Sequence, residues 1–432
     1  MVNDILEEQV DIAAHAVDEV SGVPTTPELS LQQTFAALRH RNYRLWFGGQ
    51  LISTFGTWMQ VTAQGFLVFE LTQSPAYLGY VGFAAGIPAW IFTLYGGVIA
   101  DRVPRRLLLM ATQGVMMALA AFLAADTFLG VVQPWHILVL AFLLGIVTAF
   151  DAPARHAFVL EMVGREDLTN AIALNSSVFN LATTLGPAIA GLVYAWVGPF
   201  WCFTGNAVSF IAVIAALAAM RLPAYIPPRR VLPLGEELKV GVRFVIGHPV
   251  IRVLIGGLAV TSVFGFSMMT LMPAWAVDVL HGDAKTNGWL LSARGLGSLA
   301  GALTVASVGR LVAKGRMLAM TALVVPVVMA VFAWVRLLPL AMATLVAAGW
   351  AFMVIFNMLN SLVQLHTPDP LRGRVMSVYS LSFFGVMPVG SLIVGSMAHS
   401  FGEPRTVLLN AGLLVIFALV LWLRFPAVRE LR

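Results

Sequence analysis

Residues 96–106 read GGVIADRVPRR and join two apolar runs, each long enough to cross a bilayer. Asp101, Arg102, Arg105 and Arg106 crowd into this turn, although only 11% of the 432 residues are charged and 59% are hydrophobic. The mean hydropathy is +0.86, and the charged fraction is far below the value of about a quarter that is typical of soluble domains. The sequence therefore predicts a protein that crosses a membrane many times, with a charged turn between two of its crossings.

Apolar runs on both sides of this turn predict twelve membrane-spanning helices. Each such helix needs about 20 residues, and suitable runs lie near 44–70, 75–99, 107–125, 135–155, 168–197, 199–220, 250–276, 286–308, 317–335, 338–365, 372–398 and 405–424. With both termini in the cytoplasm, 22 of the 26 Lys and Arg residues fall on the cytoplasmic side, in agreement with the positive-inside rule. The exceptions are Lys285, Arg336 and Arg405 outside, and Arg294, the only basic residue placed deep in a span. The prediction is an all-α, multi-pass protein of the cytoplasmic (inner) membrane.

Four segments divide the chain. Residues 1–38 carry acidic residues but no Lys or Arg before Arg39, which predicts a disordered cytosolic tail. Residues 39–220 and 250–432 each contain six predicted spans, and the second of these segments ends in a short cytosolic tail. Residues 221–249 are rich in Pro and basic residues and then become amphipathic, which predicts a cytoplasmic linker with a helix at the membrane surface.

The two six-span halves share identical residues when the first is aligned with the second at a shift of 204 residues. The stretch GPAIAGLVYAWVGPFWCFTGNA (186–207), set over GSLIVGSMAHSFGEPRTVLLNA (390–411), matches at six of 22 positions, and Gly191/Gly395 is one of them. Two related halves are the architecture of many secondary transporters, in which the substrate binds near the midplane between the halves. The sequence therefore predicts two pseudo-symmetric halves around a central substrate cavity.

The charged turn closely resembles the signature loop between the second and third spans of the major facilitator superfamily. The matching stretch is GVIADRVPRR (97–106), with Pro104 where the family usually has Gly. The stretches NYRLWFGGQLISTFGTWMQ, LTQSP, FDAPARHAFVLEMVGREDLTNAIALNSSVFN and LRGRVMSVYSL resemble the branch that contains macrolide-efflux and enterobactin-export proteins. His156 and Thr183 depart from that branch, where Gln and Arg are expected. The resemblance covers most of 40–424 and implies the major facilitator fold and a secondary active transporter that exports drugs or siderophores.

The charged turn is predicted to be a conformational latch, because the alternative, a topology anchor, needs no carboxylate. A helix N-terminus favours an anion, and the sequence Asp369-Pro370 suits the start of a helix. The resemblance implies the same partner, since span eleven packs against this loop when the pore is closed to the cytoplasm. Arg102 or Arg105 would then pair with Asp151. The predicted latch residues are Gly97, Asp101, Arg102, Arg105, Arg106, Asp151, Asp369 and Arg372.

A second pattern bears on the direction of transport. The stretch LGPAIAG (185–191) resembles the Gly-Pro pattern of antiporters in the superfamily, and Gly186, Pro187 and Gly191 carry the resemblance. The same residues also suit close helix packing and a kink. The resemblance implies export by proton antiport with alternating access. The alternatives are an importer or uniporter of a small metabolite, and a membrane receptor or scaffold that transports nothing.

Polar residues inside spans are candidates for lining a substrate cavity, because contact with lipid is costly for them. Hydrogen bonding between helices is the alternative role for each of them. Together with one aromatic residue, Trp58, the candidates are Gln60, Gln64, Asn175, Asn180, Arg294, Asn357, Asn360 and Gln364. Carboxylates that are suitably placed for proton coupling are few, and Glu70 and Asp151 are the candidates.

The sequence contains none of the usual signatures of an enzyme, a metal site or an ATP-driven pump. It has no HExxH, GxSxG or GxxxxGK[ST] stretch, and its single cysteine excludes an internal disulfide. The chain is therefore predicted not to be an enzyme and to need no cofactor or metal. Its predicted partners are a small-molecule substrate, protons and the lipid bilayer, without nucleic acid, and the chain is predicted to act as a monomer.

Overall fold

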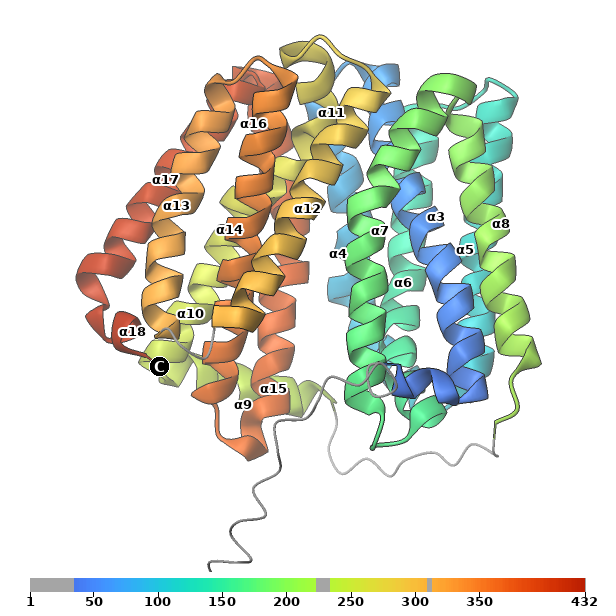
Figure 1. Ribbon diagram of the computed structural model, residues 1–432, viewed down its shortest axis with the longest axis horizontal. Helices are drawn as coiled ribbons and strands as arrows, with labels where there is room; N and C mark the ends of the chain where they lie inside the picture. The colour runs from blue at the N-terminus through green and yellow to red at the C-terminus, as the bar shows by residue number, and fades with distance from the viewer. Residues whose placement is uncertain (1–34, 223–233, 309–312, 432) are drawn as a thin grey trace, which may run out of the picture.

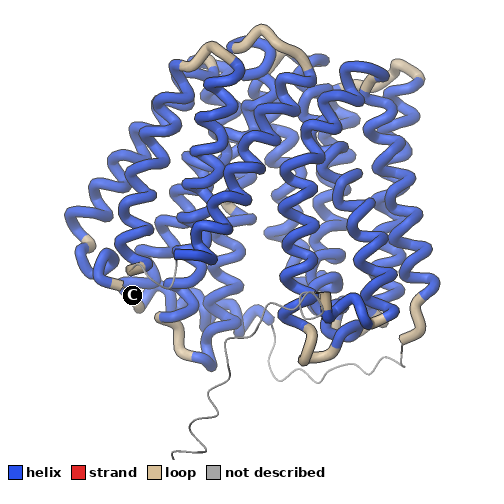
Figure 2. Tube along the Cα trace, in the orientation of Figure 1, coloured by secondary structure: helices blue, strands red, loops and turns tan. Residues whose placement is uncertain are grey.

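The computed structural model describes residues 35–222, 234–308 and 313–431, so the predictions for residues 1–34 and for residues 223–233 of the linker lie outside these ranges. The described residues form helices joined by short turns, and no strand occurs among them (Figure 2). Eleven segments of the described chain are long and apolar enough to cross a membrane. The predicted all-α, multi-pass fold is therefore confirmed.

The first half of the molecule consists of six long helices. They are α3 (Arg41–Thr72), α4 (Pro75–Ala100), α5 (Arg105–Phe128), α6 (Pro134–Val163), α7 (Leu168–Val197) and α8 (Pro199–Ala219). Helix α3 is not among the eleven apolar segments, because buried polar residues such as Gln50, Gln60 and Gln64 interrupt its apolar run. Its 32 residues nevertheless exceed the roughly 20 that a bilayer requires, and it packs against α7 and α8. Helix α3 therefore completes the twelve predicted spans.

The second half has the same number of spans, and two of them are irregular. Its regular helices are α12 (Ala284–Val308), α13 (Lys314–Trp334), α14 (Leu338–Leu365) and α17 (Glu403–Arg424), followed by the short α18 (Pro426–Glu430). Span seven is built from α10 (Pro249–Val260), η2 (Thr261–Gly265), η3 (Phe266–Leu271), α11 (Met272–Ala274) and η4 (Trp275–Val279). Span eleven is built from α15 (Asp369–Ser380), η5 (Leu381–Gly385) and α16 (Met387–Phe401).

The breaks in these two spans have a local cause. Proline lacks the N–H that would bond to the carbonyl four residues earlier, and Pro273 and Pro388 lie just after the irregular turns η3 and η5. Both η2 and η5 are π-helical turns, a conformation that often occurs at functional sites. The predicted spans at 250–276 and 372–398 lie within these two segments, and the structure adds the irregular turns inside them.

Two shorter elements mark one end of the bundle. The turn η1 (Ala36–Arg39) precedes α3, and the N–H of Ala37 donates to Asn170 Oδ1 at 2.9 Å, so the last residues of the predicted tail are ordered. Helix α9 (Leu234–Gly247) occupies the amphipathic part of the linker and packs against α15. We call the end that carries α9 and the charged turn the basic end (Figure 1). The opposite end, which carries the turns at 73–74 and 281–283, is called the far end.

The two halves touch near the far end and diverge toward the basic end (Figure 1). Across the boundary α4 packs against α16, and α7 packs against α12. Buried apolar side chains form separate clusters in the two halves. Ala274 and Ala284 of the second half are exceptions, because they belong to a cluster of the first half. Both of these alanines lie toward the far end, so apolar packing between the halves is concentrated there.

Candidate functional site

Glycines bring α7 and α12 into close contact, and we call this contact the α7–α12 seam. A Cβ atom on Gly288 would lie 2.5 Å from the carbonyl oxygen of Pro187, and one on Gly191 would lie 2.6 Å from that of Ala284. A Cβ atom on Gly295 would also meet the backbone of α7. Real Cβ atoms essentially never come closer than 3.0 Å to such atoms. Glycine is therefore required along this seam, as at other closely packed membrane helices.

A second contact, the α4–α16 seam, joins the halves on the other side. A Cβ atom on Gly79 would lie 2.7 Å from the carbonyl oxygen of Ser391, and one on Gly82 would lie 2.8 Å from Ser391 Cβ. Further along α4, the Trp90 indole N–H donates to the carbonyl of Gly385 in η5. The close contacts of this seam thus run from the start of α4 to its middle.

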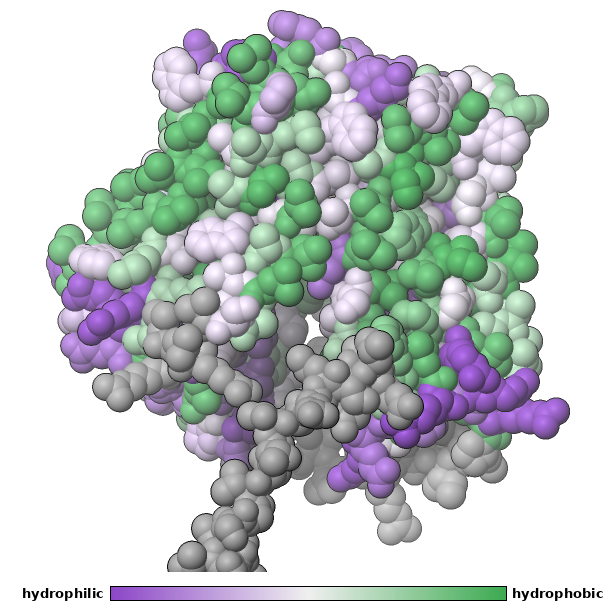
Figure 3. All heavy atoms as spheres, in the orientation of Figure 1, coloured by the Kyte–Doolittle hydropathy of each residue, from purple (hydrophilic) through white to green (hydrophobic). Residues whose placement is uncertain are grey.

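Nearer the basic end, the glycines of α12 turn toward their own half. Gly297 packs on the carbonyl of Val346, and Gly301 packs on that of Trp350, both in α14. The close glycine contacts of the two seams therefore lie in the part of the bundle next to the far end, and among the described residues α4 also contacts α9 at the basic end. Figure 3 shows the surface hollowed between the halves toward the basic end. A space between the halves that opens at one end can admit a solute from that side only.

The Gly-Pro pattern of span five lies at the α7–α12 seam. The Pro187 carbonyl and Gly191 face α12, as described above. Gly186 instead faces the first half, where its Cβ atom would lie 2.8 Å from Trp58 Cβ. The Trp58 ring packs edge-on against Phe179 at 5.7 Å. These residues thus hold α7 between α3 and the second half.

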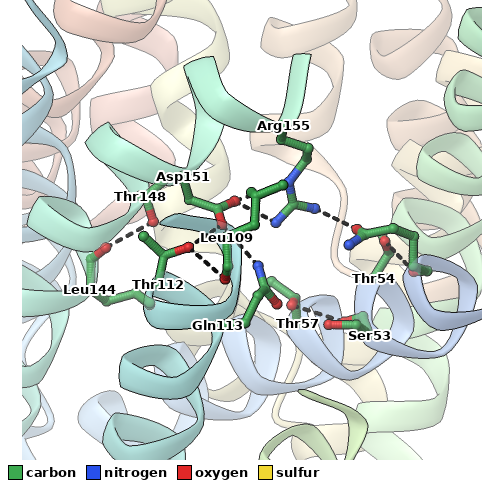
Figure 4. Close-up of polar contacts among 11 residues, drawn as sticks. Ser53, Thr54, Thr57, Leu109, Thr112, Gln113, Leu144, Thr148, Asp151 and Arg155 are labelled. Carbon is green, nitrogen blue, oxygen red and sulfur yellow. Dashed lines mark hydrogen bonds and ion pairs between the residues drawn. The ribbon is translucent and has the colours of Figure 1, made fainter. Parts of the chain in front are cut away.

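A buried polar cluster joins α3, α5 and α6 (Figure 4). Asp151, which is 2% exposed, accepts hydrogen bonds from Thr112 Oγ1 at 2.7 Å and from Gln113 Nε2 at 2.9 Å. Arg155 pairs with Asp151 through Nη2 at 2.6 Å and Nε at 3.0 Å. Arg155 Nη1 also donates to Gln50 Oε1 at 2.5 Å. The Asp151 carboxylate thus accepts hydrogen bonds from side chains of α5 and of its own helix, and Arg155 extends the cluster to α3.

In this structure Asp151 pairs with Arg155, whereas the latch prediction gives it Arg102 or Arg105 as a partner. Arg155 lies one turn after Asp151 on the same helix, and that spacing places both side chains on one face. Arg155 is the last residue of the predicted span 135–155, so the sequence analysis counts it among the cytoplasmic residues. In the structure α6 continues to Val163, and Arg155 lies inside the helix. Arg294 is therefore not the only basic residue within a span. The signal that identifies Arg155 is its spacing of four residues from a buried carboxylate.

The charged turn makes its described contacts within the first half. Arg105 Nη2 lies 3.4 Å from Asp101 Oδ1, and Arg105 Nη1 donates to Glu161 of α6. Arg106 donates to two carbonyls at the end of α8, where a cation is favoured by the helix dipole. Arg102 is exposed to solvent. These contacts fasten the turn between α4 and α5 to its neighbours α6 and α8.

The start of α15, the predicted partner of this turn, contains an ion pair of its own. Arg372 Nη2 lies 2.5 Å from Asp369 Oδ1, and the Asp369 side chain is 83% exposed. Among the described residues, a Cβ atom on Gly97 would meet nothing within 4 Å. Its neighbour Gly96 makes the close contact instead, against the carbonyl of Ala149. The ion pairs found here for Asp101, Arg105, Asp369 and Arg372 among the described residues therefore each join residues of one half.

Three cavity candidates of the first half bond to neighbouring helices or to their own. Asn206 Nδ2 of α8 donates to Gln60 Oε1 at 2.7 Å, and the Tyr43 hydroxyl donates to Asn175 Oδ1 at 3.2 Å. The Asn180 carbonyl accepts hydrogen bonds from two threonine hydroxyls of α7. For Gln60 and Asn175, the structure shows the alternative role, hydrogen bonding between helices.

The candidates on α14 bond within their own helix. Asn357 Nδ2 donates to the carbonyl of Met353 at 2.9 Å, and Gln364 Nε2 donates to Asn360 Oδ1 at 2.6 Å. All three candidate side chains are partly exposed. The protein therefore satisfies part of the hydrogen-bonding capacity of these side chains, which also remain accessible to a solute.

The two proton-coupling candidates occupy different surroundings. Asp151 is enclosed in the cluster described above, whereas Glu70 is exposed near the far end of α3. The Tyr194 hydroxyl of α7 donates to Glu70. The buried Gln64 lies on α3 between Gln50, which belongs to the Asp151 cluster, and Glu70. Glu70 therefore links α3 to the helix that forms the α7–α12 seam.

Two further buried carboxylates escaped the sequence analysis. Asp126 Oδ2 lies 2.6 Å from His136 Nδ1 at the far end of α5 and α6, and Glu403 is buried at the start of α17. Both lie at or next to the limits of predicted spans, where hydropathy does not distinguish a loop carboxylate from a buried one. Within the described ranges, no group of three or more His, Cys, Asp or Glu residues is placed to hold a metal ion.

Two six-helix halves that are joined at one end and apart at the other define a secondary transporter of the major facilitator fold. Comparison with known proteins agrees with this class. Residues 32–431 match the family described as "Transmembrane secretion effector", and the chain belongs to this branch of the major facilitator superfamily.

Similar proteins of known name are transporters. The Multidrug efflux pump Tap of Mycolicibacterium fortuitum is 28% identical, over 87% of this chain and 93% of that protein. The Staphyloferrin A transporter of Staphylococcus aureus is 24% identical, over 84% and 91% of the two chains. The Enterobactin exporter EntS of Escherichia coli is 26% identical, over 88% and 91%.

Solved structures share the fold at low sequence identity. A mutant form of the nucleoside transporter NupG matches with a TM-score of 0.72 at 13% identity, over 90% of this chain and 100% of that chain. A bacterial homolog of the human lysosomal transporter Spinster, in an inward-facing and occupied conformation, matches with a TM-score of 0.71 at 14% identity, over 89% and 96%.

Proposed function

We propose that the protein exports a small amphipathic compound, a drug or a siderophore, across the cytoplasmic membrane by proton antiport with alternating access. The observation that carries this proposal is the position of both seams next to the far end, while the halves diverge toward the basic end (Figure 1). The names of the similar efflux pumps and exporters support this cargo class. One chain forms the whole space, so a monomer suffices for transport.

In this proposal the basic end faces the cytoplasm. Most Lys and Arg residues of the sequence lie on that side, in agreement with the positive-inside rule. Both termini are then cytoplasmic, and the structure represents the state that loads cargo from inside. Release requires a second state, in which the seams open and the basic end closes. In that second state the Asp101 turn meets the start of α15, which gives the predicted latch its role.

Proton coupling requires a carboxylate whose surroundings differ between the two states. Glu70 fits this requirement, because its partner Tyr194 lies on α7, which must move relative to α12 when the α7–α12 seam opens. Asp151 is the second candidate, and the partners of its side chain all lie on helices of the first half. We assign the primary role to Glu70, since the hydrogen bonds of Asp151 are already satisfied by four donors.

The experiment that tests this function uses inside-out vesicles energised by respiration. We expect a dye or siderophore cargo to accumulate in the vesicles and to be released when a protonophore is added. Glu70→Gln is expected to slow gradient-driven accumulation at least tenfold while slowing passive equilibration far less, because the amide cannot carry the proton. Glu166→Gln, at an exposed carboxylate of the basic end, is the matched control and should behave like the wild type.

Two results would contradict the proposal. Accumulation that survives the protonophore but requires ATP or sodium would exclude proton coupling. Uptake only into right-side-out vesicles would show import, the alternative direction on the same fold.

A further inference from the structure

Arg294 lies at the level at which the seams between the halves end. Its neighbour Gly295 is the last glycine of α12 that packs against α7, where its Cβ atom would lie 2.7 Å from the carbonyl of Thr183. On the other side, the Trp90 indole bonds to Gly385 of η5 where the α4–α16 seam ends. Arg294 and η5 therefore flank the closed end of the space between the halves.

Four phenylalanines from spans seven, ten and eleven gather beside Arg294. The Phe266 ring lies 5.9 Å from Phe352, 5.7 Å from Phe356 and 5.9 Å from Phe383, measured between ring centroids. The Phe356 and Phe383 rings are 4.7 Å apart and nearly perpendicular. Phe352 is buried, whereas the other three rings are partly exposed. Together they form an aromatic surface that another ring can contact.

The Arg294 guanidinium has no counter-charge among the described residues. It is 8% exposed, its Cζ lies 5.6 Å from the centroid of Phe266, and its Nε has no hydrogen-bond partner in the described part of the chain. None of the ion pairs found among the described residues includes Arg294. An unpaired guanidinium inside a membrane is costly, and contact with a phenylalanine face recovers only part of that cost. The site is thus complementary to an anion.

We propose that Arg294, Phe266, Phe356 and Phe383 form a subsite for an anionic aromatic group of the cargo. We call this set the arginine–phenylalanine site. It rests on the proposed function and deepens it by naming the chemistry of the cargo. The aromatic ring of the cargo packs on the phenylalanines, where edge-to-face and offset contacts are favourable. Its carboxylate or catecholate oxygens accept from the planar guanidinium, which binds two oxygens at once.

The proposal predicts a definite order of affinities. An aromatic anion gains both the stacking contact and the charge contact. A neutral aromatic compound gains only the stacking contact, and an aromatic cation is repelled by Arg294. Lysine at position 294 would keep the charge but lose the fork that binds two oxygens.

The experiment measures binding of three naphthalene probes to the purified full-length protein in lipid nanodiscs by titration calorimetry. The probes are 2-naphthoate, 2-naphthalenemethanol and 2-naphthylmethylammonium, which share a ring and differ in charge. We expect 2-naphthoate to bind at least tenfold more tightly than the alcohol, and the ammonium compound to bind most weakly. Arg294→Met should remove the preference for 2-naphthoate, whereas Phe356→Leu should weaken 2-naphthoate and the alcohol by similar factors.

Arg405→Met, at an exposed arginine of the far end, is the matched control and should leave all three affinities unchanged. If Arg294→Met does not fold, Arg294→Lys replaces it and should reduce 2-naphthoate binding severalfold. Equal affinities for 2-naphthoate and the alcohol in the wild type would overturn the proposal, as would unchanged 2-naphthoate binding in the Arg294 variants. Binding requires no proton gradient, so the vesicle experiment can fail while this one succeeds, and the two proposals are tested separately.

Discussion

Gly288→Leu is expected to abolish transport while the protein still inserts and folds. A Cβ atom at this position would lie 2.5 Å from the Pro187 carbonyl oxygen and 3.1 Å from Gly191 Cα, and backbone atoms cannot move aside as a flexible side chain can. Overpacking of this kind costs about 1–3 kcal/mol, and every 1.4 kcal/mol changes an equilibrium about tenfold. The state with a closed far end should therefore lose most of its population, and cargo accumulation in vesicles should fall at least tenfold.

Gly412→Leu is the matched control, because a Cβ atom there would meet nothing within 4 Å. It introduces the same side chain into a helix of the same half without obstructing a seam. Both variants are compared for expression, thermal stability and transport. Equal transport by the two variants would show that the α7–α12 seam does not need to close.

Asp151→Asn is expected to lower both stability and transport. The substitution leaves Arg155 without its buried counter-charge, and breaking a buried ion pair costs about 3–5 kcal/mol. Because the Arg155 side chain is 34% exposed, water screens part of this loss, and the lower limit of that range is expected. The melting temperature should fall by several degrees, and transport should fall at least tenfold, because the link between α3, α5 and α6 is lost.

The double variant Asp151→Asn with Arg155→Gln separates stability from transport. Removing both charges is often nearly neutral for folding, so the double variant should regain most of the lost stability. If the pair serves transport, activity should remain low. Asp167→Asn, at a more exposed pair with His40 at 2.8 Å, is the control for stability and should change it by less than about 1 kcal/mol. Recovery of full transport in the double variant would show that the pair is structural only.

The helices could be predicted from the sequence because a membrane imposes a simple rule. A bilayer demands about 20 apolar residues for each crossing, so the run at 44–70 became α3 at Arg41–Thr72. The other spans agree within about three residues at each end, except that α6 continues to Val163, beyond the predicted end at 155. The breaks in spans seven and eleven depend on single prolines, Pro273 and Pro388, and on what packs around them. Hydropathy averaged over a window does not contain that information.

The functional site was harder to predict, for two physical reasons. In the proposed transport cycle the partners of Asp101 differ between the two states, and the sequence alone does not separate the contacts of one state from those of the other. The surroundings of Arg294 come from Phe266, Phe356 and Phe383, which lie in different spans and meet only after folding. Patterns within one short stretch could be interpreted from the sequence, since the Gly-Pro stretch does lie at a close contact between helices. The helix on the other side of that contact, α12, could not be predicted, because it comes from a distant part of the chain.

Alternating access is the central claim, and a reversible cross-link across the α4–α16 seam tests it most directly. The variant Gly82→Cys with Ser391→Cys places two thiols on opposite halves, where the Cβ positions are 2.8 Å apart and need only a slight widening for a disulfide. The native Cys202 is fully buried and should not interfere. Each single variant is a control. We predict that oxidation cross-links the double variant and stops transport, and that reduction restores it. Full transport by the cross-linked protein would contradict the account.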